Sequence, residues 1–88
     1  MSLDIKVSNT PNENALKFTV NQILMDSGHK TYDDPKQAGD SPLARKLLEI
    51  DGVASVFLIQ DFITVTKQPE VKWVELKGKI LEGIKATL

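Results

Sequence analysis

Cysteine is absent from the 88-residue sequence. Its absence excludes disulfides, thiolate nucleophiles and any metal site that would take cysteine ligands from this sequence. Chains without disulfides are typical of reducing compartments, so we expect a cytoplasmic protein. The sequence also lacks a run of about 18 apolar residues, and no apolar segment follows a basic head in its start, MSLDIKVSN, so we expect neither a membrane span nor a signal peptide.

An excess of positive charge is missing as well. The sequence has 11 basic and 12 acidic residues and a formal net charge of −1, so we expect no nucleic-acid partner. Apolar residues make up 41% and charged residues 26%, which is ordinary for a globular protein. The length suits one domain over residues 1–88.

Alternating apolar and polar residues predict four strands in two hairpins. The first hairpin spans residues 3 to 21, with a turn in NTPNEN. The second joins VASVFLIQ, residues 53 to 60, to FITVTK, residues 62 to 67, with a turn near Gln60 and Asp61. Residues 22 to 40 contain Ser-Gly, Asp-Asp-Pro and Gly-Asp and predict a long connection, in which Asp34 and Pro35 begin one helical turn.

The first of two predicted helices follows this connection. It runs from Pro42 to about Ile50, with Ser41 as its N-cap and Gly52 at the left-handed position that closes it. Its apolar stripe consists of Leu43, Leu47 and Ile50, with Ala44 and Leu48 beside it. We expect this stripe to face the sheet.

The second helix opens near Pro69 and Glu70. Its apolar residues recur at spacings of three or four, and they are Trp73, Leu76, Ile80, Ile84 and Leu88, widened by Val74 and Leu81. Gly78 and Gly83 each cost about 1 kcal/mol relative to alanine in a helix, so they either permit a close approach or loosen the helix end. The order of elements predicts an α+β fold, a two-layer β-β-α-β-β-α arrangement with a mainly antiparallel four-stranded sheet and both helices packed on one face.

Two cations lie early in the first helix, where the partly positive helix end normally favours acidic residues. Arg45 and Lys46, with the Ser41 hydroxyl and the backbone amides of Leu43 and Ala44, are therefore a candidate site for a phosphate, sulfate or carboxylate. Arg45 and Lys46 lie about 100° apart around the helix axis, so we expect one of them to reach the cap. Alternatively, both are ordinary solvated cations.

The strand VASVFLIQ has apolar residues in both of its alternating sets, although two helices cover only one face of a sheet. Either the connection at 22 to 40 folds over the other face with Ile23, Leu24, Met25 or Tyr32, or that face exposes an apolar patch for a protein partner. We take Phe57 and Ile59 as the candidate residues of such a patch. The strand alone does not show which set faces outward.

Catalytic and metal-binding patterns are sparse. His29 is the only histidine, and we expect it to be a solvated loop residue. Asp33, Asp34 and Asp40 are spaced unlike a calcium loop and are typical of turns, so we predict no metal site. No activated nucleophile, opposed carboxylate pair or phosphate-binding glycine motif is evident, so we predict that the chain is not an enzyme.

Four blocks of the sequence resemble one family. TPNENALKF at 10 to 18, DSPLARKLLEIDGVASVF at 40 to 57, DFITVTK at 61 to 67 and the helix opening at Trp73 are similar to the N-terminal domain of Nfu/NifU-type scaffold proteins. The resemblance covers nearly the whole sequence. It implies a link to iron–sulfur cluster biogenesis, in which this domain often precedes a second domain whose Cys-x-x-Cys pair holds the cluster.

The family's cluster ligands have no matching positions here, because the sequence contains no cysteine. The resemblance therefore implies a non-enzymatic accessory module that acts through iron–sulfur assembly or client proteins. It carries a family-level association with iron, but no ligand set, and thus no cofactor, is identified. The alternative is a small anion- or phosphopeptide-binding domain that uses Ser41, Arg45 and Lys46, and a third possibility, an iron carrier or metal-dependent enzyme, is distinguished by metal analysis.

Overall fold

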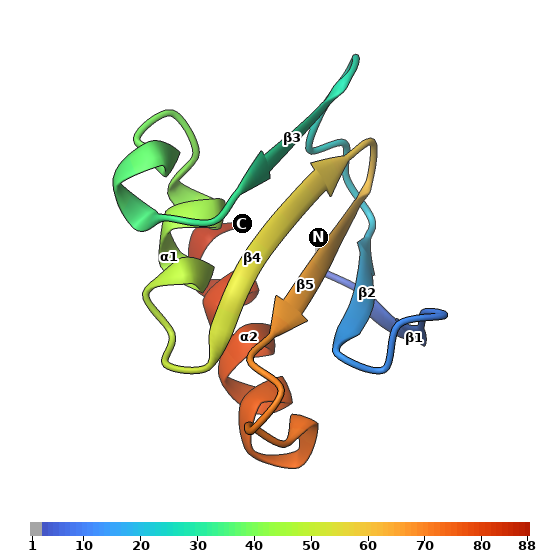
Figure 1. Ribbon diagram of the computed structural model, residues 1–88. Coiled ribbons are helices and arrows are strands. Elements are labelled where there is room, and N and C mark those ends of the chain that lie inside the picture. The colour runs from blue at the N-terminus through green and yellow to red at the C-terminus, as the bar shows by residue number, and fades with distance from the viewer. Residues whose placement is uncertain (1–2) are drawn as a thin grey trace.

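The sheet of the computed structural model, which describes residues 3–88, consists of two hairpins and one further strand (Figure 1). β1 (Ile5–Asn9) pairs with β2 (Ala15–Val20), and β4 (Val53–Ile59) pairs with β5 (Phe62–Lys67). β2 and β5 join the hairpins, and β3 (His29–Tyr32) adds to the outer side of β4. The strand order is β1-β2-β5-β4-β3 and every pairing is antiparallel, so both predicted hairpins are confirmed.

The sheet has five strands, not the four that we expected. The additional strand, β3, lies in the predicted connection at 22 to 40 and pairs with β4 between Val56 and Ile59. Its sequence, HKTY, has no alternating apolar residues, so its pairing depends on backbone hydrogen bonds to a strand that comes much later in the chain. The predicted helical turn is confirmed as the 3₁₀ helix η1 (Pro35–Ala38), where the Asp34 carboxylate accepts a hydrogen bond from the Lys36 amide at 3.0 Å.

Both helices pack on the same face of the sheet, which is the far face in Figure 1. α1 (Pro42–Leu48) ends two residues earlier than predicted, and Gly52 has the expected left-handed backbone, with φ at 100°. α2 (Trp73–Thr87) begins later than Pro69, because the Val71 amide donates to the Gln68 carbonyl in a turn before the helix. No helix within residues 3–88 combines the length and the apolar composition needed to cross a membrane.

The core lies between the helices and the sheet. Its largest fully buried side chains come from both layers and are Phe18, Leu47, Val56, Ile63, Val65, Leu76, Ile80 and Ile84. The predicted stripe of the first helix is confirmed, since four of its members are buried and Ile50 packs against the core. Val74 does not widen the stripe of α2 as expected, because its side chain is 84% exposed.

The tip of the β4–β5 hairpin holds the connection between β2 and β3. Gln60 has a left-handed backbone with φ at 49°, and its carbonyl accepts hydrogen bonds from the amides of Leu24 and Met25 at 2.7 and 3.0 Å. The Asp61 carbonyl accepts the Val20 amide at 2.8 Å. Leu24 and Met25 belong to no strand, and these hydrogen bonds pair their backbone amides. The chain can therefore cross the hairpin tip and reach the opposite edge of the sheet.

The two glycines of α2 have different surroundings. A Cβ at Gly83 would lie 3.0 Å from Leu47 Cδ2, so Gly83 is where α1 and α2 approach closely. A Cβ at Gly78 would meet nothing within 4 Å. Packing therefore disfavours a larger residue at Gly83 but not at Gly78.

A buried lysine ties the β1–β2 turn to the segment between β5 and α2. Lys67 is 7% exposed, and its ammonium donates to Asn14 Oδ1 at 3.1 Å and to the carbonyls of Gln68 and Pro69 at 3.3 and 3.5 Å. The Trp73 indole donates to the Glu13 carbonyl at 3.0 Å across the same junction. The three ammonium donors are thereby satisfied, which a buried charge requires.

We expect Gly78→Ala to raise the free energy of unfolding by about 1 kcal/mol, because alanine restricts the unfolded chain and fits the helix. Gly83→Ala should be less stable than Gly78→Ala by about 1–3 kcal/mol, because its methyl group meets Leu47 in a packed core. Urea denaturation of the two variants measures the difference. Equal stabilities would show that α1 and α2 do not depend on a close approach at Gly83.

We expect Lys67→Met to lower the free energy of unfolding by about 1–3 kcal/mol, because the Asn14 side chain and the carbonyls of Gln68 and Pro69 lose their donor. Lys77→Met, an exposed substitution on α2, is the matched control and should change stability by no more than about 0.5 kcal/mol. Urea denaturation tests both. A Lys67→Met variant as stable as the control would show that the ammonium does not hold the junction together.

Candidate functional site

The face of the sheet opposite the helices carries a half-buried apolar cluster. Side chains alternate along β4, so Phe57 and Ile59 point away from the core in which Val56 and Leu58 are buried. Ile59 lies opposite Phe62 of β5, which is also half-buried. We call Phe57, Ile59 and Phe62 the open-face cluster.

Polar residues of four strands surround the open-face cluster. The register forms two rows across the sheet, the first with Lys6, Thr19, Phe62, Ile59 and His29, and the second with Ser8, Lys17, Thr64, Phe57 and Thr31. The ring centroids of His29 and Phe57 are 5.3 Å apart, and the Lys17 ammonium lies 4.2 Å from the centroid of Phe62. His29 is exposed, as expected, but it belongs to a strand and not to a loop.

The connection at 22 to 40 places its apolar residues elsewhere. Leu24 and Met25 pack against the core, while Ile23 is 68% exposed. Tyr32 is buried and lies opposite Val56, on the helix side of the sheet. These four residues therefore do not form a cover over the open-face cluster, and the use of Phe57 and Ile59 in partner binding stays a prediction.

The N-terminus of α1 is capped from within the chain. The Ser41 hydroxyl accepts a hydrogen bond from the Ala44 amide at 3.2 Å, and the Ser41 carbonyl accepts the Arg45 amide at 3.0 Å. Leu43 and Ala44 are buried. Ser41 thus satisfies an amide that the anion hypothesis assigned to a ligand.

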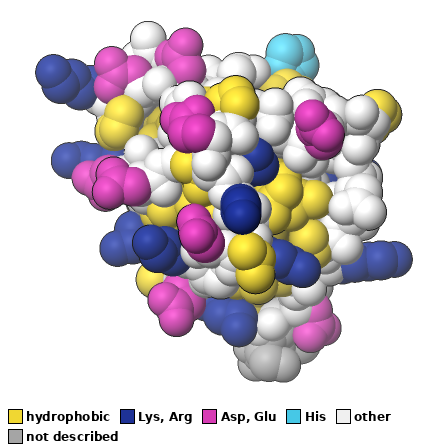
Figure 2. All heavy atoms as spheres, turned by 60° about the horizontal axis from the view of Figure 1, so that its bottom comes forward, with side chains coloured by type: hydrophobic (Ala, Val, Ile, Leu, Met, Phe, Trp, Pro, Cys, Tyr) yellow, Lys and Arg dark blue, Asp and Glu magenta, His cyan; other side chains and the backbone are white. Residues whose placement is uncertain are grey.

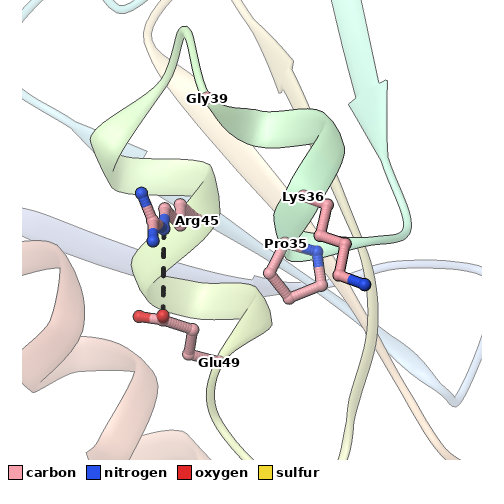
Figure 3. A pocket seen from close by; sticks show the side chains of 5 residues that line it. All are labelled: Pro35, Lys36, Gly39, Arg45 and Glu49. Carbon is pink, nitrogen blue, oxygen red and sulfur yellow. Dashed lines mark ion pairs between the residues drawn. The ribbon is translucent and has the colours of Figure 1, made fainter.

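The two cations of α1 point to different places. Arg45 Nε lies 3.8 Å from a Glu49 carboxylate oxygen one turn further along, as Figure 3 shows. Arg45 and Glu49 line an open depression of about 450 Å³ together with Pro35, Lys36 and Gly39. The stem of Lys46 lies toward Gly83 of α2. Arg45 and Lys46 are therefore not brought together at the cap.

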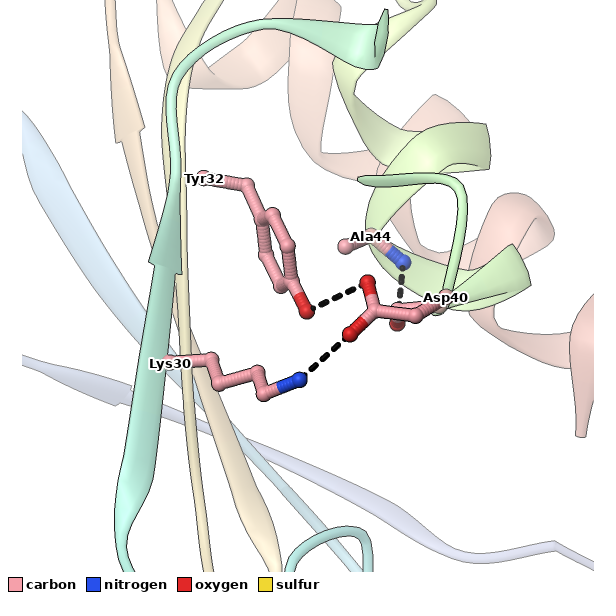
Figure 4. Close-up of polar contacts among 5 residues, drawn as sticks. Lys30, Tyr32, Asp40 and Ala44 are labelled. Carbon is pink, nitrogen blue, oxygen red and sulfur yellow. Dashed lines mark hydrogen bonds and ion pairs between the residues drawn. The ribbon is translucent and has the colours of Figure 1, made fainter. Parts of the chain in front are cut away.

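An internal carboxylate lies next to this helix end. Asp40 accepts hydrogen bonds from the Lys30 ammonium and from the Tyr32 hydroxyl, the latter at 2.9 Å (Figure 4). The hydrogen bond from Lys30, followed by that from Tyr32, lowers the pKa of Asp40, and the bond to Asp40 raises the pKa of Lys30. Burial, with the bond to Asp40, raises the pKa of Tyr32. The Asp40 cluster (Lys30, Tyr32 and Asp40) thus fixes β3 to the start of α1.

Two acidic residues of the connection have partners within the chain. Asp34 caps η1, as expected of a turn residue, whereas the Asp40 carboxylate accepts hydrogen bonds from Lys30 and Tyr32 of β3. Within residues 3–88, no group of three or more histidine and acidic side chains is arranged to hold a metal ion. Figure 2 shows lysine, arginine and acidic side chains interspersed over one side of the molecule.

Sequence reasoning did not identify Phe62, Lys17 or Lys6 as part of the candidate site. The alternation of FITVTK and the predicted turn at Gln60 were sufficient to place Phe62 beside Ile59. The two lysines reach this surface through pairing of β2 with β5 and of β1 with β2. The β2–β5 pairing joins segments about 45 residues apart, for which the sequence has no local signal.

The chain matches the family model described as "Scaffold protein Nfu/NifU N terminal" over residues 5–88. It is 44% identical over 81 residues to the human "NFU1 iron-sulfur cluster scaffold homolog, mitochondrial". This alignment covers 91% of this chain and 32% of the relative. It is 38% identical over 80 residues to "NifU-like protein 4, mitochondrial" of Arabidopsis thaliana, with 91% of this chain and 28% of the relative covered. The chain thus spans about a third of the length of these curated relatives.

Two solved structures share its fold. The solution structure of a NifU-like protein from Saccharomyces cerevisiae aligns with a TM-score of 0.81 and 31% identity, over 96% of this chain and 76% of that one. The crystal structure of protein SAV1430 from Staphylococcus aureus aligns with a TM-score of 0.72 and 29% identity, over 94% and 95% of the respective chains. The α+β class and the two helices beside an antiparallel sheet are confirmed by this likeness.

We expect Asp40→Asn to destabilise the protein at neutral pH, and the loss should disappear in acid. The native pKa of Asp40 is below its ordinary value of 3.8, so the stabilisation by its charge is present above that pH and is lost as the pH falls through the native pKa. The native pKa of Lys30 is above 10.5, so its contribution is present below that pH and is lost at higher pH. Urea denaturation across this pH range measures the difference, with Asp26→Asn as the matched control. A loss from Asp40→Asn that stays equal in acid and at neutral pH would contradict this role.

Proposed function

Because the chain belongs to the family of Nfu/NifU scaffold N-terminal domains, we propose that it is a non-enzymatic accessory module of iron–sulfur cluster assembly or delivery that acts by binding protein partners. Family membership supports a role in iron–sulfur cluster assembly or delivery. That the chain acts by binding protein partners is inferred from its own surface. The iron–sulfur cluster would be carried by the partner, because this sequence provides no cysteine to hold it.

The observation that carries the proposal is the open-face cluster. Phe57, Ile59 and Phe62 are neighbours on a face that neither helix covers, and all three are half-buried. Contiguous apolar side chains on a solvent-facing sheet surface commonly mark protein contact sites. The three residues lie on paired antiparallel strands and not on a loop. Binding a partner here therefore does not cost the entropy of ordering a flexible segment.

A catalytic role receives no comparable support from the arrangement of polar groups. The Lys67 ammonium holds the junction of Asn14 with the segment before α2, and Asp40 fixes β3 to α1. Both groups are explained by stability. Neither is placed beside a nucleophile as a general base would be.

The anion- or phosphopeptide-binding alternative stays a prediction without a supporting observation. Arg45 pairs with Glu49, and the Ser41 hydroxyl is occupied by the Ala44 amide. The compartment is likewise a prediction. Lack of cysteine favours the cytoplasm, whereas the names of the human and Arabidopsis relatives are mitochondrial.

We expect Phe57→Thr/Ile59→Thr to reduce capture of iron–sulfur assembly or client proteins from the native cell extract by at least about fivefold, the equivalent of about 1 kcal/mol of binding energy. Threonine keeps the strand propensity of both positions but removes apolar contact area. Quantitative mass spectrometry of proteins retained by the immobilised chain measures the effect.

Val74→Thr is the matched control, because Val74 is 84% exposed on α2, away from the sheet face. Thermal unfolding establishes that each variant is folded before capture. Retention of the same assembly proteins by the double variant would exclude the open-face cluster as the contact. Stoichiometric iron in the purified chain would contradict the proposed mode of action, since it would show a carrier and not an accessory module.

A further inference from the structure

The strands of the sheet carry charge of one sign only. The five strands contain four lysines and one histidine but no aspartate or glutamate, although the whole sequence has 12 acidic residues. Two of these lysines are used internally, since Lys30 pairs with Asp40 and Lys67 is buried. The other two, Lys6 and Lys17, project on the same side as the open-face cluster.

We infer that the open face selects a partner segment in which apolar side chains are flanked by carboxylates. This inference rests on the proposed function and names the chemistry of the partner. The apolar side chains would cover Phe57, Ile59 and Phe62, and the carboxylates would meet Lys6 and Lys17. Complementary charges around an apolar centre favour such a segment over a neutral one and increase its rate of encounter.

Lys17 is already positioned for this role. Its ammonium lies over the Phe62 ring, 4.2 Å from the ring centroid, so its charge is already held against a member of the open-face cluster. Lys6 lies one strand further out, in the same row as Phe62. A carboxylate that binds here pairs with an ammonium whose side chain loses little freedom, and covering the cluster strengthens the pair by excluding water.

Within residues 3–88, no acidic residue belongs to the strands that form this surface. Asp4 precedes β1, and Asp61 lies in the turn between β4 and β5. His29 completes the row at the opposite edge, beside Ile59. The interior of the surface therefore contains apolar, threonine and lysine side chains but no carboxylate.

A single-stranded nucleic acid is a weaker match for the same surface. Its bases would need free aromatic faces, but Lys17 lies over Phe62 and His29 contacts Phe57. Two lysines also provide little charge for a phosphate backbone in a chain with a net charge of −1. The apolar centre with a cationic border favours a protein segment.

The experiment is an NMR titration of the isotope-labelled chain with three peptides that share phenylalanine and leucine positions. Glutamate flanks these positions in the first peptide, glutamine in the second and lysine in the third. The glutamate peptide should shift the amide resonances of β2, β4 and β5 around the cluster. It should bind about fivefold or more tightly than the glutamine peptide, with the preference decreasing as salt is added.

Lys6→Gln/Lys17→Gln should remove the preference for glutamate over glutamine, and Lys72→Gln/Lys77→Gln, at exposed positions, is the matched control. Equal binding of the glutamate and glutamine peptides, or failure of both to bind, would overturn the inference. Tighter binding of oligouridylate than of the glutamate peptide would overturn it in favour of a nucleic-acid surface.

The double lysine variant also separates this inference from the proposed function. If it captures iron–sulfur assembly proteins from extract as well as the unaltered chain does, the proposed function stands and selection by charge is wrong. If capture of these proteins is lost with the double lysine variant and kept with the control, the inference is supported. Glutamate-dependent peptide binding by a chain that captures no assembly protein would support the surface chemistry and contradict the proposed function.

Discussion

Antiparallel pairing of β2 with β5 is the constraint on which the rest of the structure depends. It joins two hairpins that are separated by the connection and α1, and it aligns Phe18 with Ile63 at the centre of the core. Just beyond this pairing, the Asp61 carbonyl accepts the Val20 amide, and at the other end the Lys67 amide donates to the Asn14 carbonyl. Both the crossing of the hairpin tip and the Lys67 junction therefore follow from one non-local strand pairing.

The same pairing creates the candidate site. It places Lys17 beside Thr64 and Phe62, within a surface that also contains Phe57 and Ile59 of the neighbouring strand. Residues 3–88 form two α-helices, and both pack on one face, so the apolar residues of β4 that alternate with the core remain at the surface. When a central strand of a two-layer fold is apolar on both faces, one set of its apolar side chains stays at the surface unless another segment covers it.

The connection at 22 to 40 has a structural role that its composition does not suggest. It extends the sheet by one strand and then presents Asp40 to Lys30 and Tyr32, close to the start of α1. The chain's own carboxylate therefore lies where the two early cations of α1 suggested an external anion. Arg45 interacts instead with Glu49, one turn further along the helix, and both side chains are exposed.

Much of the fold could be predicted from local patterns. Alternation identified both hairpins, the Ser-Pro start identified α1, and the spacing of Leu76, Ile80 and Ile84 identified the buried face of α2. The edge strand β3 escaped prediction because HKTY has no periodic apolar signal. The start of α2 was misplaced because a turn at Gln68 to Val71 precedes it. Which glycine of α2 is needed for packing was equally undetermined, since Gly78 and Gly83 differ only in what approaches them.

By itself, the sequence determined the class of fold, the family resemblance and the absence of cysteine ligands. It also determined that β4 is apolar in both alternating sets, but not which set lies outside. Only the tertiary structure decided that Phe57 and Ile59 face away from the helices and that Lys17 lies over Phe62. The physical reason is that periodicity is encoded between near neighbours, whereas the composition of a surface depends on which distant strands share hydrogen bonds and in which register.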